Sequence, residues 1–253
     1  MAFEPRTRLY VVTDLAAGAS VGVSESQAHF LRTVLRLETG APVSLFNGRD
    51  GEWRAVIEGF GKGFCTLKVA ERMREQRPEG DLWLAFAPIK RARIDFLVEK
   101  ATELGVSVLQ PVITERTQVD RVNLVRLSAN VLEAAEQTER LTLPEVRPPL
   151  SLDRLIATWP AGRRLLLCDE SGLSPDIATA LGAEPPSLWG LLTGPEGGFT
   201  ERELDALKKL PFVCPAGLGP RVLRADTAAL AALAVFQALL GDWRAGSESR
   251  RHG

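Results

Sequence analysis

The pattern of apolar and polar positions changes character near residue 80. Before that point, short β-rich runs are separated by turn residues, and one short helix is expected around Ser26–Leu35. The expected strands are Leu9–Val12, Pro42–Phe46, Trp53–Ile57 and Cys65–Val69, with Asn47-Gly48 and Asp50-Gly51 in the turn between two of them. Several strands joined by brief turns within about seventy residues predict a small β-barrel over residues 1–73.

A polar segment, Arg72–Gly80, has the composition of a linker between domains. After it, apolar runs typical of strands alternate with segments of helical periodicity. The expected strands are Leu82–Ala87, Val106–Ile113, Leu165–Cys168, Leu188–Thr193 and Phe212–Cys214, and the expected helices are Arg91–Leu104, Leu124–Glu139, Pro175–Leu181, one after Thr200 and one over Thr227–Leu240. This order predicts an α/β domain over residues 78–244 with a mostly parallel sheet between helices, followed by a disordered tail, Ala245–Gly253.

Composition narrows the class of protein only moderately. The 253 residues are 45% hydrophobic and 25% charged, as in soluble globular proteins, and the net charge of −1 provides no global basic field for nucleic acid. Three cysteines and two histidines show no disulfide or zinc spacing, and neither a signal segment nor a membrane span is evident. We therefore expect a cytoplasmic protein with no metal and no membrane partner.

A glycine-rich loop, Gly194–Gly198, follows the expected strand Leu188–Thr193. Thr200 and Glu203 form the capping box of a helix, so the loop joins a strand to a helix. Glycines let the backbone approach a ligand closely, and ligands of parallel sheets bind at the carboxyl ends of strands. The alternatives are an ordinary turn or a phosphate loop, although the G-x-x-x-x-G-K-[ST] motif of the latter is absent.

A second loop, Leu218–Leu223, follows the expected strand Phe212–Cys214 and precedes a helix that is apolar nearly all the way round. Gly219 permits close approach and Pro220 fixes the turn, which indicates a second ligand-lining loop. Asp226 stands at the start of the last helix, where a carboxylate commonly serves as an N-cap or dipole partner. The helix itself must be covered on most sides, either by the protein's own core or by a second copy.

These motifs resemble the RsmE family of SPOUT-class RNA methyltransferases. The resemblance rests on the segments Leu192–Phe199, Leu218–Arg224, Thr227-Ala228, His29–Arg36, Phe46–Gly48, Lys100–Val106 and Glu136-Gln137, which cover both expected domains in the same order. It implies a PUA-like β-barrel followed by a SPOUT α/β domain with a C-terminal trefoil knot. It further implies a homodimer that uses S-adenosyl-L-methionine to methylate N3 of a uridine in 16S ribosomal RNA of the small ribosomal subunit, near the decoding centre.

The resemblance assigns expected roles to individual residues. The cofactor is expected at Leu192, Thr193, Gly194, Pro195, Glu196, Gly197, Gly198, Leu218, Gly219 and Leu223. Catalysis, which must stabilise the N3 anion or remove its proton, is expected at Arg224 and Asp226. RNA contacts are expected at Arg6, Arg8, Arg32, Arg36, Lys90, Arg91 and Arg221. Lys90, Arg91 and Arg93 also lie at a helix N-terminus, where their charge opposes the helix dipole and favours a nearby anion.

The chain departs from the family's pattern in one loop, and two other functions remain open. The family usually has Ser-Gly-Arg after Glu136-Gln137, whereas this chain has Thr138-Glu139-Arg140, which replaces a small flexible residue with a charged one. Asp226 also stands where relatives often carry Glu. One alternative function is a SPOUT methyltransferase for a tRNA base or a ribose 2′-hydroxyl. The other is a ribosome assembly factor that docks on RNA without catalysis.

Overall fold

The computed structural model describes residues 5, 7–119, 121–182 and 187–245. Contacts divide the chain into two compact units: Met1–Pro78 with Leu132–Leu143, and Glu79–Val131 with Pro144–Gly253. The boundaries expected from the sequence, 1–73 and 78–244, stay a prediction. The tail 246–253 lies outside the described residues.

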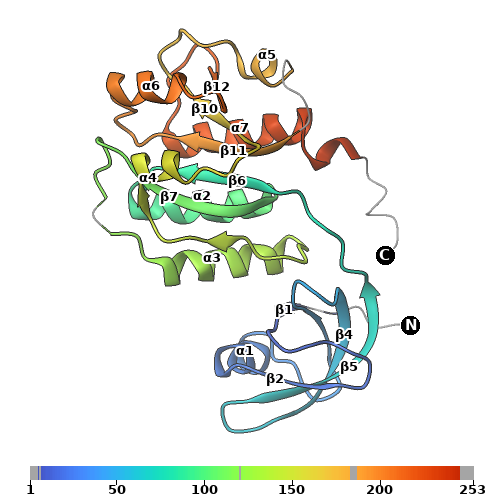
Figure 1. Ribbon diagram of the computed structural model, residues 1–253. Helices are drawn as coiled ribbons and strands as arrows, with labels where there is room; N and C mark the ends of the chain where they lie inside the picture. Colours follow the sequence, from blue (N-terminus) through green and yellow to red (C-terminus); the bar gives the residue numbers. More distant parts are fainter. Residues whose placement is uncertain (1–4, 6, 120, 183–186, 246–253) are drawn as a thin grey trace. The chain divides into compact units, whose positions relative to one another are not determined.

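The first unit contains, in its described part, a five-stranded sheet in the order β1-β3-β4-β5-β2 (Figure 1). Its strands are β1 (Arg8–Tyr10), β2 (Ser20–Val23), β3 (Pro42–Phe46), β4 (Glu52–Phe60) and β5 (Cys65–Arg74). The pair β1–β3 is parallel and the other pairs are antiparallel. Strand β2 was not expected. Strand β5 runs through Arg74 because it continues to pair with β4, so the expected linker begins later than its polar composition indicates.

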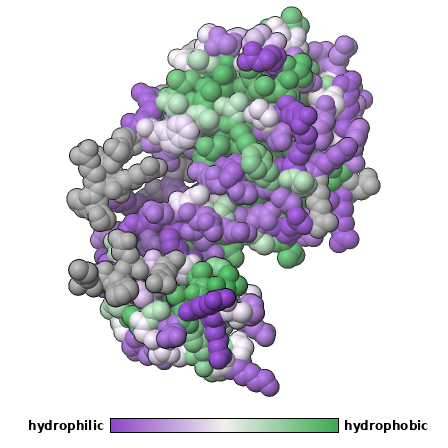
Figure 2. Space-filling view, turned by 180° about the vertical axis from the view of Figure 1, so that it is seen from behind, coloured by the Kyte–Doolittle hydropathy of each residue, from purple (hydrophilic) through white to green (hydrophobic). Residues whose placement is uncertain are grey.

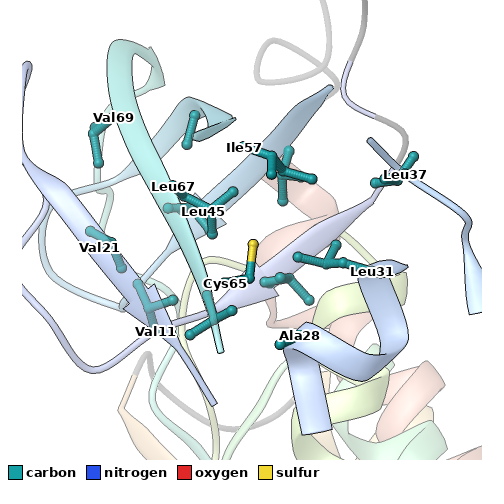
Figure 3. Packing of buried hydrophobic residues seen from close by; sticks show 14 of the residues in the cluster. Val11, Val21, Ala28, Leu31, Leu37, Leu45, Ile57, Cys65, Leu67 and Val69 are labelled. Atoms are coloured by element: carbon teal, nitrogen blue, oxygen red, sulfur yellow. The ribbon is translucent and has the colours of Figure 1, made fainter. Parts of the chain in front are cut away.

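Alternation along the strands directs one set of side chains into a common core. Figure 3 shows side chains from β2, β3, β4 and β5 converging, with Ala28 and Leu31 closing one side of the core. Those two residues lie on a short helix, α1 (Glu25–His29), and on the π-helical turn Phe30–Val34 that continues it. Ser24 is the N-cap of helix α1, and its side chain forms a capping box with Gln27. The expected helix is therefore present.

The turn between β3 and β4 has the conformation that its sequence demands. The Asn47 side-chain oxygen accepts hydrogen bonds from the backbone N–H groups of Arg49 and Asp50, which is the Asx-turn geometry. Gly51 has φ +86°, and a Cβ there would lie 2.2 Å from the Arg74 carbonyl oxygen. Only glycine fits that position.

The described part of the second unit holds a seven-stranded sheet in which β12-β10-β11-β6-β7-β8 lie in order and β9 also pairs with β7. All of these pairings are parallel. The strands are β6 (Leu82–Phe86), β7 (Val106–Ile113), β8 (Glu145–Val146), β9 (Leu150–Ser151), β10 (Arg163–Cys168), β11 (Leu188–Thr193) and β12 (Val213–Ala216). The helices are α2 (Arg91–Glu103), α4 (Leu152–Ala157), α5 (Ile177–Gly182), α6 (Glu201–Lys208) and α7 (Ala225–Leu239), followed by a 3₁₀ turn, Asp242–Ala245. Helix α3 (Leu124–Gln137) begins in this unit, and its residues from Leu132 on belong to the first unit.

Helices cover both faces of this sheet, because its central strands are apolar on both sides. Leu165, Leu167 and Leu192 pack with α4 and α6 in one cluster. On the other side, the ring of Trp189 meets that of Phe236 on α7 at 6.0 Å. The predicted fold class, a small N-terminal sheet domain before an α/β domain with a parallel sheet, is confirmed. The short elements β8, β9 and α4 were not expected from the sequence.

Candidate functional site

Three loops meet at the carboxyl ends of neighbouring strands β12, β10 and β11 of the second unit. They enclose a cavity of about 360 Å³, within the usual range for small-molecule sites. The loop after β10 contributes Asp169, Glu170 and Gly172, the loop after β11 contributes Gly194–Glu196 with Gly198-Phe199, and the loop after β12 contributes Gly217–Arg224. Helix α7 closes the cavity with Ala225 and Ala228.

The loop after β11 leaves backbone donors free for a ligand. Its only internal backbone bond among the described residues runs from the Gly198 N–H to the Pro195 carbonyl, 2.9 Å. The backbone N–H groups of Gly194 and Glu196 have no hydrogen-bond partner among the residues that the structure describes. Gly198 has φ +67°, the left-handed region that favours glycine, and the end of the Glu170 side chain from the loop after β10 lies against it.

A buried carboxylate holds the loop after β10 in place. The side chain of Asp169 is fully buried and accepts hydrogen bonds from the Ser174 hydroxyl at 2.5 Å and the Ser171 hydroxyl at 2.8 Å, and it pairs with the Lys208 ammonium at 2.7 Å. Burial alone would raise the pKa of Asp169, but these partners outweigh burial and lower the pKa to about 2. Burial raises the pKa of the neighbouring Cys168 thiol to about 12, so this thiol is not a nucleophile.

Most of the expected cofactor residues line the cavity, and two do not. Those that line it are Thr193, Gly194, Pro195, Glu196, Gly198, Leu218, Gly219 and Leu223. Leu192 instead packs in the core between the sheet and helices α4 and α6. Gly197 faces away from the cavity, since a Cβ there would lie 3.5 Å from the Cβ of Arg116.

The two expected catalytic residues occupy different surroundings. Arg224 lines the cavity and is the N-cap of α7, and its guanidinium has no partner among the described residues. Arg221 lines the cavity as well. Asp226 does not: its carboxylate lies 3.6 Å from the Arg93 guanidinium, and it accepts a hydrogen bond from the Thr227 N–H at 3.0 Å. The anion that the sequence predicts near Arg93 on α2 is therefore, for this residue, the carboxylate of Asp226.

The expected RNA-binding residues divide between exposed positions and an internal one. Lys90, Arg32 and Arg36 are exposed, and Arg36 has φ +53°. Arg6 and the side chain of Arg91 lie outside the described residues. Arg8 is only 12% exposed, and its guanidinium donates to Glu52 and to the carbonyls of Ala135, Glu136 and Arg140 at 2.7–3.1 Å. Its donors are therefore engaged within the first unit, and we no longer propose it as a phosphate ligand.

The motif Glu136-Gln137 ends α3 and, with Leu132–Leu143, belongs to the first unit. Glu136 accepts a hydrogen bond from the Tyr10 N–H at 2.9 Å, and burial raises the pKa of its carboxyl. Glu139, in the loop that departs from the family's pattern, has φ +61°, the left-handed region that favours glycine. The carbonyl of Glu139 accepts a hydrogen bond from Arg74 at 2.8 Å. This segment therefore has a structural place in the first unit.

The loop after β10 was missed as a site. Asp169, Glu170 and Gly172 line the cavity and follow the expected strand Leu165–Cys168 directly. Two acidic residues and a glycine at the carboxyl end of a predicted parallel strand were a usable signal, by the rule that identified the loop after β11.

The described residues also give two negative findings. They contain no group of three or more His, Cys, Asp and Glu side chains that could hold a metal ion. Among them, no helix combines the length and apolar character needed to cross a membrane.

Comparisons with known proteins agree with the geometry. A family model described as an RNA methyltransferase domain matches residues 75–237, and one described as an RNA methyltransferase PUA domain matches residues 23–70. Ribosomal RNA small subunit methyltransferase E of Rickettsia conorii is 32% identical over 234 residues, which is 92% of this chain and 95% of that protein. The enzyme of that name from Synechocystis is 36% identical over 238 residues, which is 92% of this chain and 78% of that protein.

A solved structure extends the likeness to three dimensions. Ribosomal RNA small subunit methyltransferase E from Neisseria gonorrhoeae, solved with bound S-adenosyl methionine, superposes with a TM-score of 0.83 at 28% identity and covers 94% of this chain and 99% of that one. The likeness thus spans both units and the cavity loops. This chain therefore belongs to the RNA methyltransferase family, and its relatives are the RsmE proteins that its motifs resemble.

Proposed function

We propose that this protein transfers the methyl group of S-adenosyl-L-methionine to N3 of a specific uridine in 16S ribosomal RNA, near the decoding centre of the small ribosomal subunit. The observation that carries the proposal is the cavity at the ends of β12, β10 and β11, because the two loops that carry the family's motifs, after β11 and β12, both line it. A cytoplasmic setting follows from the substrate. We also propose that the C-terminal part of the α/β domain forms the trefoil knot of the SPOUT fold.

The cavity residues suit S-adenosylmethionine. Its size is that of a small-molecule site, and the unpaired N–H groups of Gly194 and Glu196 can hydrogen-bond the polar edge of an adenine or an amino-acid moiety. Glu170 and Glu196 are among the residues that line the cavity, and their negative charge complements a cationic ligand. When bound, the cofactor supplies an electrophilic methyl group on a positively charged sulfur.

Arg224 is the residue that we propose acts on the uracil. N3 of uridine carries a proton and becomes nucleophilic only when that proton is lost, so a cation beside the base lowers the barrier. Arg224 lines the cavity with an unpaired guanidinium, whereas Asp226 is engaged with Arg93. We therefore give Arg224 the direct role and Asp226 a supporting one. Arg221, on the same loop, is placed to contact RNA phosphate.

We propose that the protein acts as a homodimer through α7. Ala229, Leu233 and Phe236 of this helix are buried within the chain. Its opposite face is also apolar, and Leu230, Ala231, Ala234 and Ala238 there are only partly covered. Figure 2 shows an apolar area on the surface of the second unit amid hydrophilic side chains. A second copy of α7 is a fitting cover for a face of small apolar residues.

The test is methyl transfer from labelled S-adenosylmethionine to small ribosomal subunits lacking the modification, to their free RNA and to tRNA, with the labelled nucleoside identified. We expect N3-methyluridine at one position of 16S ribosomal RNA. Labelled tRNA or a ribose-methylated nucleoside would contradict the substrate. Saturable cofactor binding without transfer to any RNA would favour a docking factor instead. Light scattering in solution should give twice the mass of the chain, and a monomer would contradict the dimer.

A further inference from the structure

The turn that follows β7 contacts the loop after β11 from outside the cavity. Strand β7 is not adjacent to β11, because β6 lies between them. The turn Thr114–Thr117 nevertheless reaches the loop across the end of β6, and it is held in shape by the Thr117 hydroxyl, which accepts a hydrogen bond from the Thr114 N–H at 2.9 Å. None of its residues lines the cavity.

Arg116 provides the first connection. Its Nη1 donates to the carbonyl oxygen of Gly197 at 2.8 Å and to that of Phe199 at 3.3 Å. Its Cβ and Cδ lie 3.5 and 3.6 Å from the point where a Cβ on Gly197 would stand. One guanidinium therefore holds two carbonyls of the loop on the side away from the cavity, and the Arg116 side chain lies alongside Gly197 at ordinary van der Waals distance.

Glu203 provides the second connection. It is only 7% exposed. Its Oε1 accepts a hydrogen bond from the Glu115 N–H at 2.9 Å, while its Oε2 accepts one from the Thr200 N–H at 2.8 Å. Glu203, the acidic member of the capping box of α6, thus ties the end of the loop to the same turn that carries Arg116.

We infer that Arg116 is a positioning residue, which fixes the backbone of the loop Gly194–Phe199 so that its free N–H groups keep the geometry that binds S-adenosylmethionine. The argument is that a loop with one internal backbone bond cannot hold its own shape. Two charge-assisted bonds to its carbonyls remove their freedom to rotate, which lowers the ordering cost of binding. The inference rests on the proposed cofactor, but the effect of the Arg116 hydrogen bonds on the mobility of the loop can be measured without a cofactor.

The experiment compares Arg116→Ala and Arg116→Lys with the control Arg202→Ala. Arg202 is a matched control because it is 85% exposed and lies 3.8 Å from Glu115 of the same turn, without touching the loop carbonyls. Amide hydrogen exchange is followed first, in the protein without cofactor. We expect the Gly198 and Thr200 amides to exchange about tenfold faster in Arg116→Ala, because both bonds from the guanidinium to the loop carbonyls are lost, and to be unchanged in the control.

Cofactor affinity is measured next, by calorimetry with S-adenosylmethionine. We expect the Kd to rise about tenfold in Arg116→Ala, with partial recovery in Arg116→Lys and little change in the melting temperature. Unchanged exchange and Kd together with a higher KM for RNA would overturn the inference and make Arg116 an RNA contact. If the wild-type protein binds no S-adenosylmethionine, the proposed function fails. The exchange result still decides whether Arg116 restrains the loop Gly194–Phe199.

Discussion

Two pairs of arginines, one pair in each unit, are used in opposite ways. In the first unit, Arg8 and Arg74 flank Glu52, whose side chain is 6% exposed, at 2.7 and 2.5 Å. Arg8 also lies over the ring of Phe46, 4.5 Å from its centroid. In the second unit, Arg221 and Arg224 stand at the edge of a cavity, and the described residues offer their guanidinium groups no hydrogen bond or ion pair.

The difference shows that residue type and motif position do not decide what an arginine does. Arg8 has its donors satisfied by one carboxylate and three carbonyls, so its removal should be felt as lost stability. An unpaired guanidinium beside a cavity has free N–H donors that can bind an anion, so its removal should lower the rate of methyl transfer. The variants below separate these two outcomes.

Glu52→Gln should have the largest effect, on stability. The change leaves the Arg8 and Arg74 guanidinium groups without their shared anion, and breaking such a buried cluster costs about 4 kcal/mol. The free energy of unfolding, measured in urea, gives the value. Glu71→Gln is the control, because Glu71 pairs with Arg54 at 2.8 Å but is 64% exposed, and its loss should cost less than about 1 kcal/mol. Equal losses would mean that burial of Glu52 is not what matters.

Arg224→Ala should come next, with its effect on activity. We expect methyl transfer to fall by about a hundredfold, as when one electrostatic stabiliser of a developing anion is removed, with the free energy of unfolding unchanged. Single-turnover transfer and the Kd for S-adenosylmethionine are measured separately. Arg154→Ala, an exposed change on α4, controls for the loss of a surface charge. Equal losses in transfer and affinity would instead give Arg224 a cofactor role.

Asp169→Asn should show a smaller, pH-dependent loss of stability. The pKa of Asp169 is lowered from 3.8 to about 2, so its stabilising contribution of about 2 kcal/mol is fully present above pH 4 and is lost as the pH falls through 2. Urea unfolding at pH 7 should therefore separate wild type from variant, and the difference should shrink between pH 4 and pH 2. A difference independent of pH would show that the cost is steric rather than electrostatic. Asp153→Asn, at an exposed position, is the control.

Local pattern predicts the strands well where burial is one-sided or complete. The bounds of β3, β7 and β11 follow directly from their apolar runs. Short elements such as β2 and α4 are not predicted, because they have too few residues to show a hydrophobic periodicity. Their existence depends on partners elsewhere in the chain.

The site shows the same limit. The loops after β11 and β12 can be identified from glycines at strand ends, but their convergence with the loop after β10 depends on the strand order β12-β10-β11, which no local pattern contains. Likewise, Gly197 does not line the cavity and instead contacts Arg116, a residue 81 positions earlier in the chain. Sequence therefore predicts which loops bind a ligand better than it predicts which side of each loop does so.

The smallest effect should be a gain in stability. Glu139 has φ +61°, which is unfavourable for a residue with a Cβ and ordinary for glycine. Its carbonyl, which accepts a hydrogen bond from Arg74, is part of the backbone and survives substitution. Glu139→Gly should therefore raise the free energy of unfolding by up to about 1 kcal/mol, measured in urea.

Glu133→Gly is the matched control for this change. Glu133 is exposed like Glu139 but lies within α3, where glycine costs about 1 kcal/mol relative to a good helix former. The same substitution should thus act in opposite directions six residues apart, which no argument from charge or exposure predicts. If both variants lose stability, the Glu139 side chain contributes more than its backbone conformation costs. In that case, Glu139 would stabilise this loop better than the glycine that the family usually has at this position.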